Sequence, residues 1–424
     1  MGTSQAIQAV HVSHPAPRGR AALRSLGALT LLALLALLAL TGCATAPPPT
    51  PAIDPAPLIH DELFAPARDV IEPDKVMAIS PRMRQFLHDR LPNSTTGPLM
   101  LDTRDLRAML LDALYKRGDL QLEYDAEMTR TAAEAYDAKA GNCLSLAMMT
   151  AVFAREMGLP VTFRQIYDEE QWSRVGDLQV VSGHVNIALA RRRTDFRVLG
   201  EESSLVVDFL PGAQIARQRA MAIDERMIVA MYLNNRAAEL MSQAQTDRAY
   251  WWARAAWLYD PRLLSALNTL GVIYRRHGET VLAERVFRAV LAREPANVQA
   301  MGNLVQALRF QDKLAEAQAY EAQLAALQPF PPFKFFDLGV AAMKTGDYAK
   351  ARDYFAKEID RSAYYHEFHF WMALANVGLG KWDIVRDELA KAEEYSVTSR
   401  QRQLYSAKLD SLRAKMDRPT VKSR

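Results

Sequence analysis

The second half of the chain has a hydrophobic pattern that repeats every 34 residues. Each unit contains two runs of apolar residues at helical spacing, separated by a turn. The units begin, in phase, at Ala230, Leu264, Val298, Pro332 and His366. Prolines and glycines mark the same period, at Pro261, Pro295, Pro329, Gly278, Gly346 and Gly380. Such a pattern predicts stacked pairs of helices, each of which buries its apolar face only against neighbouring units.

The second unit resembles the tetratricopeptide repeat most fully. It has the family's residues at Leu270-Gly271, Tyr274, Ala283, Phe287 and Pro295. The resemblance implies five repeats over residues 230–399, which form an all-α superhelix, and then a capping helix and tail over residues 400–424.

Repeats of this family bind proteins or peptides in a groove lined by the first helix of each unit. By this resemblance the groove would present Asn234, Asn268, Arg275, Arg276, Arg309 and Lys344. Basic and amide side chains favour an acidic or carboxylate-ended peptide. The alternative is an ordinary solvated helix face, and it is favoured because the set does not reproduce the family's carboxylate-binding pattern.

The first half has a mixed pattern of helices and strands. Ser80-Pro81 predicts one helix start, and another helix is expected from Asp102. A long apolar helix runs from Cys143 until Gly158 ends it. Strands are expected over residues 161–167, 181–189 and 204–210, with a turn at residues 168–170.

The start of the apolar helix and two of the strands carry candidate chemistry. Cys143 lies where the free N–H groups of a helix N-terminus favour a thiolate. His184 and Asp208 lie on the two later strands. A thiol, an imidazole and a carboxylate supply a nucleophile, its base and a group that orients the base. Taken singly, each residue has a structural alternative: a buried core cysteine, an exposed strand histidine and a carboxylate at a strand end.

Together these segments resemble the transglutaminase-like cysteine peptidase superfamily. The resemblance rests on Gly141-Asn142-Cys143 and on the strands that carry His184 and Asp208. It implies an α+β, papain/transglutaminase-like domain over residues 61–215, with a nucleophile helix on an antiparallel sheet and a Cys143–His184–Asp208 triad. The Cys143 backbone N–H is a candidate oxyanion donor and Asn142 a weaker one. Leu144 departs from the acidic or small polar residue of many members, so the substrate class stays open.

The N-terminus has the pattern of a bacterial lipoprotein. Basic residues precede an apolar run that is too short to favour a spanning helix. Leu40-Thr41-Gly42-Cys43 resembles a lipobox, which implies a signal peptide over residues 1–42 and a lipid on Cys43. A Pro-rich tether over residues 43–60 follows, and Ala44 implies the outer membrane, facing the periplasm. A secretory signal or an uncleaved anchor is the alternative.

The cysteine count and the net charge limit the classes of function that the sequence allows. Cys43 and Cys143 are the chain's two cysteines, so a lipid on the first leaves the second without a disulfide partner in the chain. The 52 basic and 49 acidic residues give a net charge of +3, too small to imply nucleic acid, and nothing implies a cofactor or metal.

The sequence therefore predicts an envelope lipoprotein with cysteine-dependent amide or isopeptide hydrolase activity, or transamidase activity, on a protein or peptide recruited by the repeats. The alternative is a non-catalytic interaction or assembly protein that uses the same domains as a scaffold.

Overall fold

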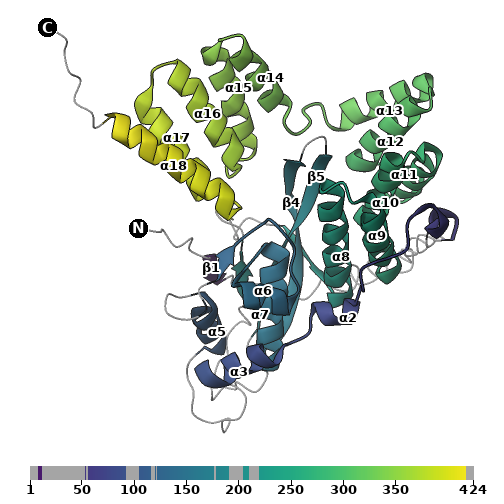
Figure 1. Ribbon diagram of the computed structural model, residues 1–424, viewed down its shortest axis with the longest axis vertical. Helices are drawn as coiled ribbons and strands as arrows, with labels where there is room; N and C mark the ends of the chain where they lie inside the picture. The colour runs from purple at the N-terminus through teal and green to yellow at the C-terminus, as the bar shows by residue number, and fades with distance from the viewer. Residues whose placement is uncertain are drawn as a thin grey trace, which may run out of the picture.

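The computed structural model describes residues 8–11, 53, 56–91, 105–115, 120, 122–175, 178–190, 204–209 and 219–416. For residues 8–11, 168–175, 178–182 and 412–416 only the backbone is described. A central antiparallel sheet and its helices lie between two groups of paired helices (Figure 1).

The sheet has the strand order β1-β6-β5-β4-β7, and every neighbouring pair is antiparallel. Its strands are β1 (Gln8–His11), β4 (Val161–Val175), β5 (Leu178–Leu189), β6 (Leu205–Asp208) and β7 (Ala220–Ile223). Helix α7 (Cys143–Glu156) packs on β5, and each of its residues from Cys143 to Ala154 is buried. The predicted helix on an antiparallel sheet is therefore present.

Three short helices surround α7: α3 (Pro81–Arg90), α5 (Leu106–Tyr115) and α6 (Ala132–Ala138). Ser80 caps α3, as predicted, by accepting a hydrogen bond from the Met83 N–H. The rings of Phe86 and Phe153 lie 5.8 Å apart between α3 and α7, and the hydroxyls of Tyr115 and Thr150 join α5 to α7 at 2.9 Å. Helix α2 (Pro73–Val76) precedes α3. The predicted helix start at Asp102 lies outside the described residues.

One expectation for the first half is wrong. Residues 168–170, predicted as a turn, belong to β4, where the pairing with β5 shifts register between Ile166 and Gln171. Residues 8–11, which lie within the predicted signal peptide, form the edge strand β1 opposite β6. A second, two-stranded sheet pairs β2 (Glu123–Tyr124) with β3 (Ala140–Gly141).

The second half forms pairs of helices with the predicted period. The first helices are α8 (Glu225–Ser242), α10 (Leu264–His277), α12 (Val298–Phe310), α14 (Lys334–Lys344) and α16 (His366–Gly378). The second helices are α9 (Thr246–Tyr259), α11 (Thr280–Arg293), α13 (Leu314–Leu327), α15 (Tyr348–Arg361) and α17 (Trp382–Glu394), and each starts 34 residues after the one before. Helix α18 (Ser399–Met416) follows, as predicted.

The turn between the two helices of a unit has one conformation throughout. Gly278, Gly346 and Gly380 have positive φ there, and so do Ala244 and Asp312 at the same position of the first and third units. The Leu-Gly pairs permit close packing, because a Cβ on Gly271 would lie 2.5 Å from the ring of Phe287. The glycines of the sequence pattern therefore have two separate structural causes.

Replacing Ala244 by Gly is expected to stabilise the protein by about 0.5–1 kcal/mol, since a left-handed residue with a Cβ costs about 1–2 kcal/mol. The midpoint of thermal unfolding measures the effect. Ala322→Gly, on an exposed part of α13, is the matched control and should destabilise by about 1 kcal/mol. Equal destabilisation by both substitutions would contradict the strain at Ala244.

The stack of helices is interrupted between the third and fourth units. Helix α11 packs on α12 and α15 on α16, whereas α13 makes no comparable contact with α14. Leu338 of α14 is 41% exposed, although Leu270 and Leu304 at the same position of two earlier units are 0% exposed. The units stay in phase along the sequence, but the superhelix divides at residues 328–333 (Figure 1).

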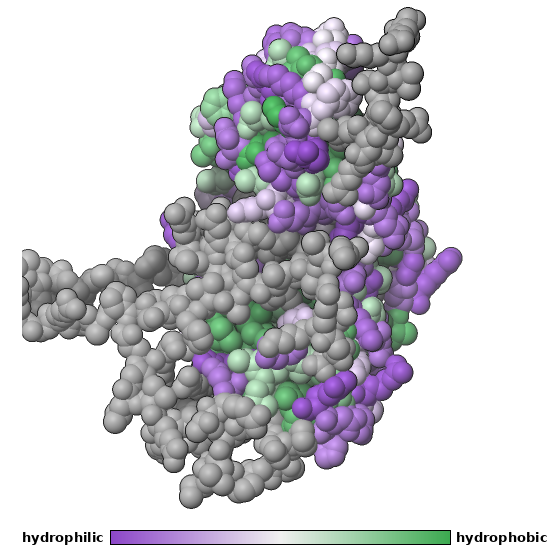
Figure 2. Space-filling view, turned by 90° about the vertical axis from the view of Figure 1, so that its left-hand side faces the viewer, coloured by the Kyte–Doolittle hydropathy of each residue, from purple (hydrophilic) through white to green (hydrophobic). Residues whose placement is uncertain are grey.

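The part after this division, residues 333–416, is called here the C-terminal lobe. It has its own core around Phe333, Phe336, Phe355 and Phe368. It returns to the sheet region, where the Ala126 N–H donates to the Val397 carbonyl at 2.8 Å. The face in Figure 2 is largely hydrophilic over its upper part, with hydrophobic residues scattered among the hydrophilic ones. A mainly hydrophilic outer face suits a lobe that ends a repeat array.

Residues 56–72, called here the N-terminal strap, pack along the first two units. Leu58 is 4% exposed, and its carbonyl accepts a hydrogen bond from the Tyr274 hydroxyl at 2.9 Å. The His60 N–H donates to the hydroxyls of Tyr250 and Tyr274. The Phe64 ring stacks on Tyr250, with 3.9 Å between ring centroids.

The strap continues along α9. The indole N–H of Trp251 donates to the Ala65 carbonyl, and Asp69 accepts from both Trp252 and Arg248. The prediction of a tether as far as residue 60 is therefore wrong at its end, because residues 58–60 belong to the packed fold. One continuous core reaches from the strap through α7 to α13.

Candidate active site

Cys143 is the first residue of α7, and the preceding residue fixes its position. Asn142 is the N-cap: its Oδ1 accepts from the Ser145 N–H at 3.0 Å, and its Nδ2 donates to Thr129 Oγ1 at 2.8 Å. Cys143 itself is 8% exposed. The thiol therefore lies, nearly buried, at the helix end where the first backbone N–H groups have no acceptor within the helix.

The role of Asn142 differs from the weaker sequence prediction. Its amide oxygen caps the helix and its amide nitrogen is directed to Thr129. This arrangement makes Asn142 a capping residue, and it does not support Asn142 as an oxyanion donor.

His184 and Asp208 are brought together in the middle of the sheet. They lie on the neighbouring strands β5 and β6, and both are buried. His184 Nε2 lies 2.7 Å from one carboxylate oxygen of Asp208 and 2.9 Å from the other. Asn186, two residues along β5, donates to the same carboxylate at 3.0 Å. The carboxylate is thus held from two sides and orients the imidazole.

The second ring nitrogen of His184 is left for the thiol. Nδ1 is buried and makes no hydrogen bond of good geometry among the described residues, but the ring interacts with the Cys143 side chain. The pKa of His184 is raised to about 10: burial acts to lower it, but the Asp208 hydrogen bond and then the Cys143 side chain outweigh burial. An imidazole with this pKa is protonated at neutral pH, which suits a partner that carries negative charge.

Tyr124 is a further residue of the site that the sequence analysis missed. Strand β2 pairs Tyr124 with Gly141, two residues before the cysteine. The phenol oxygen accepts from the Cys143 backbone N–H, and burial, followed by the charge of the Cys143 side chain, raises its pKa well above the ordinary value. The phenol therefore stays protonated beside the thiol. A two-residue strand gives no periodic signal, so the sequence offered no means of finding it.

Three of the six predicted groove residues form contacts within the array. Arg309 forms an ion pair with Glu321 at 2.6 Å, Arg276 donates to the Met241 carbonyl, and Asn303 donates to Asn268. Arg275 and Asn234 are partly exposed and Lys344 is exposed. Lys344 also lies beyond the division of the stack, in the C-terminal lobe. The six residues therefore do not form one continuous charged groove, which favours the solvated-face alternative.

The remaining predicted features have separate outcomes. Cys43 and the predicted lipobox lie outside the described residues. Within the described ranges, no helix combines the length and the apolar character needed to cross a membrane. The same residues contain no group of three or more His, Cys, Asp or Glu side chains placed to hold a metal ion.

The chain is similar to solved TPR proteins over its C-terminal helical part. A thermophilic TPR protein of Thermus thermophilus is 18% identical with a TM-score of 0.27, and the match covers 42% of this chain and 98% of that one. For pilF of Pseudomonas aeruginosa the identity is 18%, the TM-score 0.26 and the coverage 47% and 96%. YrrB, a TPR protein with an unusual peptide-binding site, is 18% identical with a TM-score of 0.23 and coverage of 42% and 92%.

No protein-family model matches the chain, and no curated protein matches it. The helix pairs, their 34-residue period and their left-handed turns together make residues 225–394 a tetratricopeptide-like array.

Proposed function

We propose that the protein binds a protein or peptide partner through its repeat array and hydrolyses an amide or isopeptide bond at Cys143. The binding half rests on the array, since stacked helix pairs form extended surfaces for protein partners. The catalytic half rests on one observation: the buried His184 ring is held through Nε2 by Asp208, while its Nδ1 is left to the thiol of Cys143.

In the proposed reaction the Cys143 thiolate attacks the carbonyl carbon, so that a C–S bond forms and the carbonyl oxygen becomes negative. The Tyr124 hydroxyl is a donor available to that oxygen, and the Cys143 backbone N–H becomes a second donor if it exchanges the Tyr124 oxygen for the substrate oxygen. The protonated His184 gives its Nδ1 proton to the leaving amine as the C–N bond breaks. Water then attacks the thioester, with His184 as base, and releases the acid and the thiol. Hydrolysis and transamidation differ only in whether water or an amine accepts the acyl group.

The rival proposal is a non-catalytic scaffold that uses the same fold for assembly. The size of the array and the burial of Cys143 support it. The two proposals make opposite statements about the thiol: a catalytic Cys143 is a thiolate at neutral pH, whereas a scaffold cysteine is an inert packed group.

Cys143 is expected to react with iodoacetamide at pH 7 at least about tenfold faster than the same thiol in the unfolded chain. A Cys43→Ser form leaves Cys143 as the chain's only thiol, so mass spectrometry can follow its alkylation directly. His184→Ala in the same background should remove the difference. Alkylation of the folded protein no faster than of the unfolded chain would favour the scaffold.

The lipid anchor is also part of the proposal. The mature chain is expected to begin at a diacylated Cys43 in the outer membrane, and Cys43→Ala should abolish the modification. Cleavage before Cys43 removes β1 and leaves β6 as an edge strand of the sheet. N-terminal mass spectrometry of the mature protein decides: a mature chain that retains residues 8–11 would contradict the anchor.

A further inference from the structure

A carboxylate of the first repeat unit lies next to the loop that supports the nucleophile helix. Glu239 belongs to α8, and its Oε1 accepts from the backbone N–H of Thr129 at 2.6 Å. Its other oxygen pairs with Arg236 at 2.5 Å, and both side chains are 20% exposed. Thr129 lies between β2 and α6, in the part of the chain that contains Tyr124, and is itself buried.

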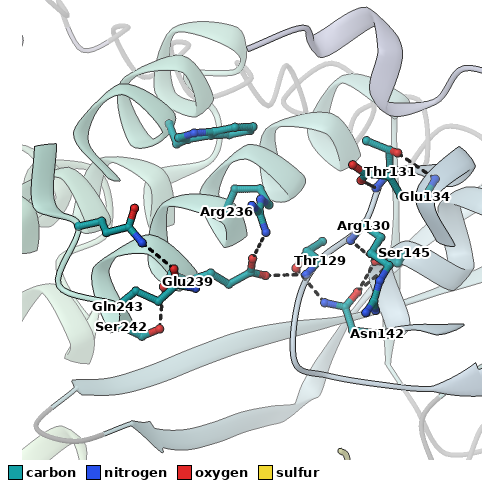
Figure 3. A network of polar contacts seen from close by, with 12 residues as sticks. Thr129, Arg130, Thr131, Glu134, Asn142, Ser145, Arg236, Glu239, Ser242 and Gln243 are labelled. Carbon is teal, nitrogen blue, oxygen red and sulfur yellow. Dashed lines mark hydrogen bonds and ion pairs between the residues drawn. The ribbon is translucent and has the colours of Figure 1, made fainter. Parts of the chain in front are cut away.

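The contacts continue from Thr129 to the start of α7 (Figure 3). Thr129 Oγ1 accepts from Asn142 Nδ2 at 2.8 Å, and Asn142 Oδ1 accepts from both the N–H and the hydroxyl of Ser145. The Ser145 hydroxyl in turn accepts from the Arg130 N–H at 2.8 Å. Glu239 is therefore joined, through Thr129, to the residue that caps the nucleophile helix directly before Cys143.

Burial of the Glu239 carboxylate carries a desolvation cost. Burial raises the pKa of Glu239, against the hydrogen bonds from Thr129 and the charge of Arg236. If Glu239 served only to pair with Arg236, an exposed position would spare it the cost of desolvation. Exposed ion pairs contribute little stability, so pairing alone does not account for the burial of Glu239. Its second partner is the backbone N–H of Thr129, which lies outside the repeat array. Because Thr129 is buried, this N–H needs an acceptor that is held in place.

We propose that Glu239 is a positioning residue, through which the first repeat unit sets the N-cap of α7 and hence the reactivity of Cys143. The inference deepens the proposed hydrolase and rests on it for its functional meaning. Arg236, the partner of Glu239, also lines a cleft of about 700 Å³ between the strap and α6, α8 and α9. The connection therefore begins at a surface that is open to solvent.

The test uses the full chain with Cys43→Ser, in which Cys143 is the chain's only thiol. Glu239→Ala removes the acceptor, whereas Glu239→Gln keeps an oxygen for the Thr129 N–H and loses the charge. Thr129→Val removes the hydroxyl that accepts from Asn142. Glu284→Gln is the matched control, because Glu284 is a buried carboxylate of the second unit that pairs with Arg288 and Lys313.

Two measurements follow each variant: the alkylation rate of Cys143 against pH, and the hydrogen exchange of the backbone amides of residues 143–146. Glu239→Ala and Thr129→Val should slow alkylation at pH 7 by about fivefold, move its pH dependence to higher pH and speed the exchange of these amides. Glu239→Gln and Glu284→Gln should stay within about twofold of the starting protein.

The exchange measurement keeps the inference separate from the proposed hydrolase. An unreactive Cys143 in the starting protein would refute the hydrolase, while faster exchange in Glu239→Ala would still support the positioning role. Unchanged exchange and unchanged alkylation in a folded Glu239→Ala protein would overturn the inference. If Glu239→Ala does not fold, Thr129→Val decides, because it removes only the hydroxyl that joins Thr129 to Asn142 and leaves the Thr129 N–H with its acceptor Glu239.

Discussion

Replacing Asp208 by Ala is expected to slow the alkylation of Cys143 at pH 7 by about 30-fold, because an ordinary thiol of pKa about 8.5 is only ~3% ionised there. Without the carboxylate, only the Cys143 side chain opposes the effect of burial on His184, so the pKa of the ring falls. The neutral imidazole no longer stabilises the thiolate. Turnover of a substrate should fall further, on the order of 10³-fold, because the ring is also no longer oriented.

The same substitution changes how stability depends on pH. The folded-state pKa of His184, about 10, lies above the ordinary 6.5, so the protonated ring stabilises the fold fully below pH 6.5. That contribution is lost as the pH rises from 6.5 towards 10. Urea unfolding of the starting protein should therefore show a loss of stability across this range that Asp208→Ala lacks.

Asp260→Ala is the control for both measurements. Asp260 is a buried carboxylate of the repeat array that pairs with Arg262, away from the cysteine. Its loss should lower stability without changing alkylation. If both variants altered alkylation equally, the effect would come from general destabilisation and not from the His184–Asp208 pair.

Replacing Phe64 by Ala is expected to destabilise the protein by about 3–5 kcal/mol, as for other buried aromatic residues. Phe64 is 6% exposed and packs against Tyr250, Tyr274 and His277. Trp251 donates to the carbonyl of the next residue, Ala65, so tryptophan fluorescence in a urea titration reports release of the strap. The loss of stability should appear in the unfolding step of the first three units and the sheet region, because these share the core that contains Phe64.

The control is Val70→Ala in the same strap, because Val70 is 82% exposed and should change stability by less than about 0.5 kcal/mol. The C-terminal lobe has its own core, so a second unfolding step from that lobe should keep its midpoint. Equal effects of the two strap substitutions would mean that the strap is not packed on the array in solution.

The sequence predicted the elements well where a local pattern was repeated. The second helices begin in phase, and the helix from Cys143 and the strands of His184 and Asp208 are present. These features follow from apolar spacing and turn residues that lie close together in the chain. Asn186 was within reach as well, since a residue two positions from His184 lies on the same face of a strand.

The position at which the molecule divides into separate cores could not be predicted from such local patterns. The sequence pattern separates the chain near residue 215, yet the structure has one core across that point and a gap at residues 328–333. A fragment that begins between Gly212 and Ile223 would lack the strap and with it part of the core of the first two units. Leu338 is the residue that the repeat pattern expects at a buried position. The sequence therefore gives no sign of the gap, which is seen only in the exposure of this side chain.

The strap also determines the order in which the molecule can form. His60 contacts Tyr250 and Tyr274, which follow it by 190 and 214 residues. Contacts of such separation require a long loop to close, which slows folding relative to local helix pairing. When the chain is synthesised from its N-terminus, Phe64 therefore has no repeat residue to pack against until Tyr250 of the first unit has been made, and its contacts are complete only with Tyr274 of the second. The repeats, although they come later in the chain, therefore provide the surface on which the strap folds.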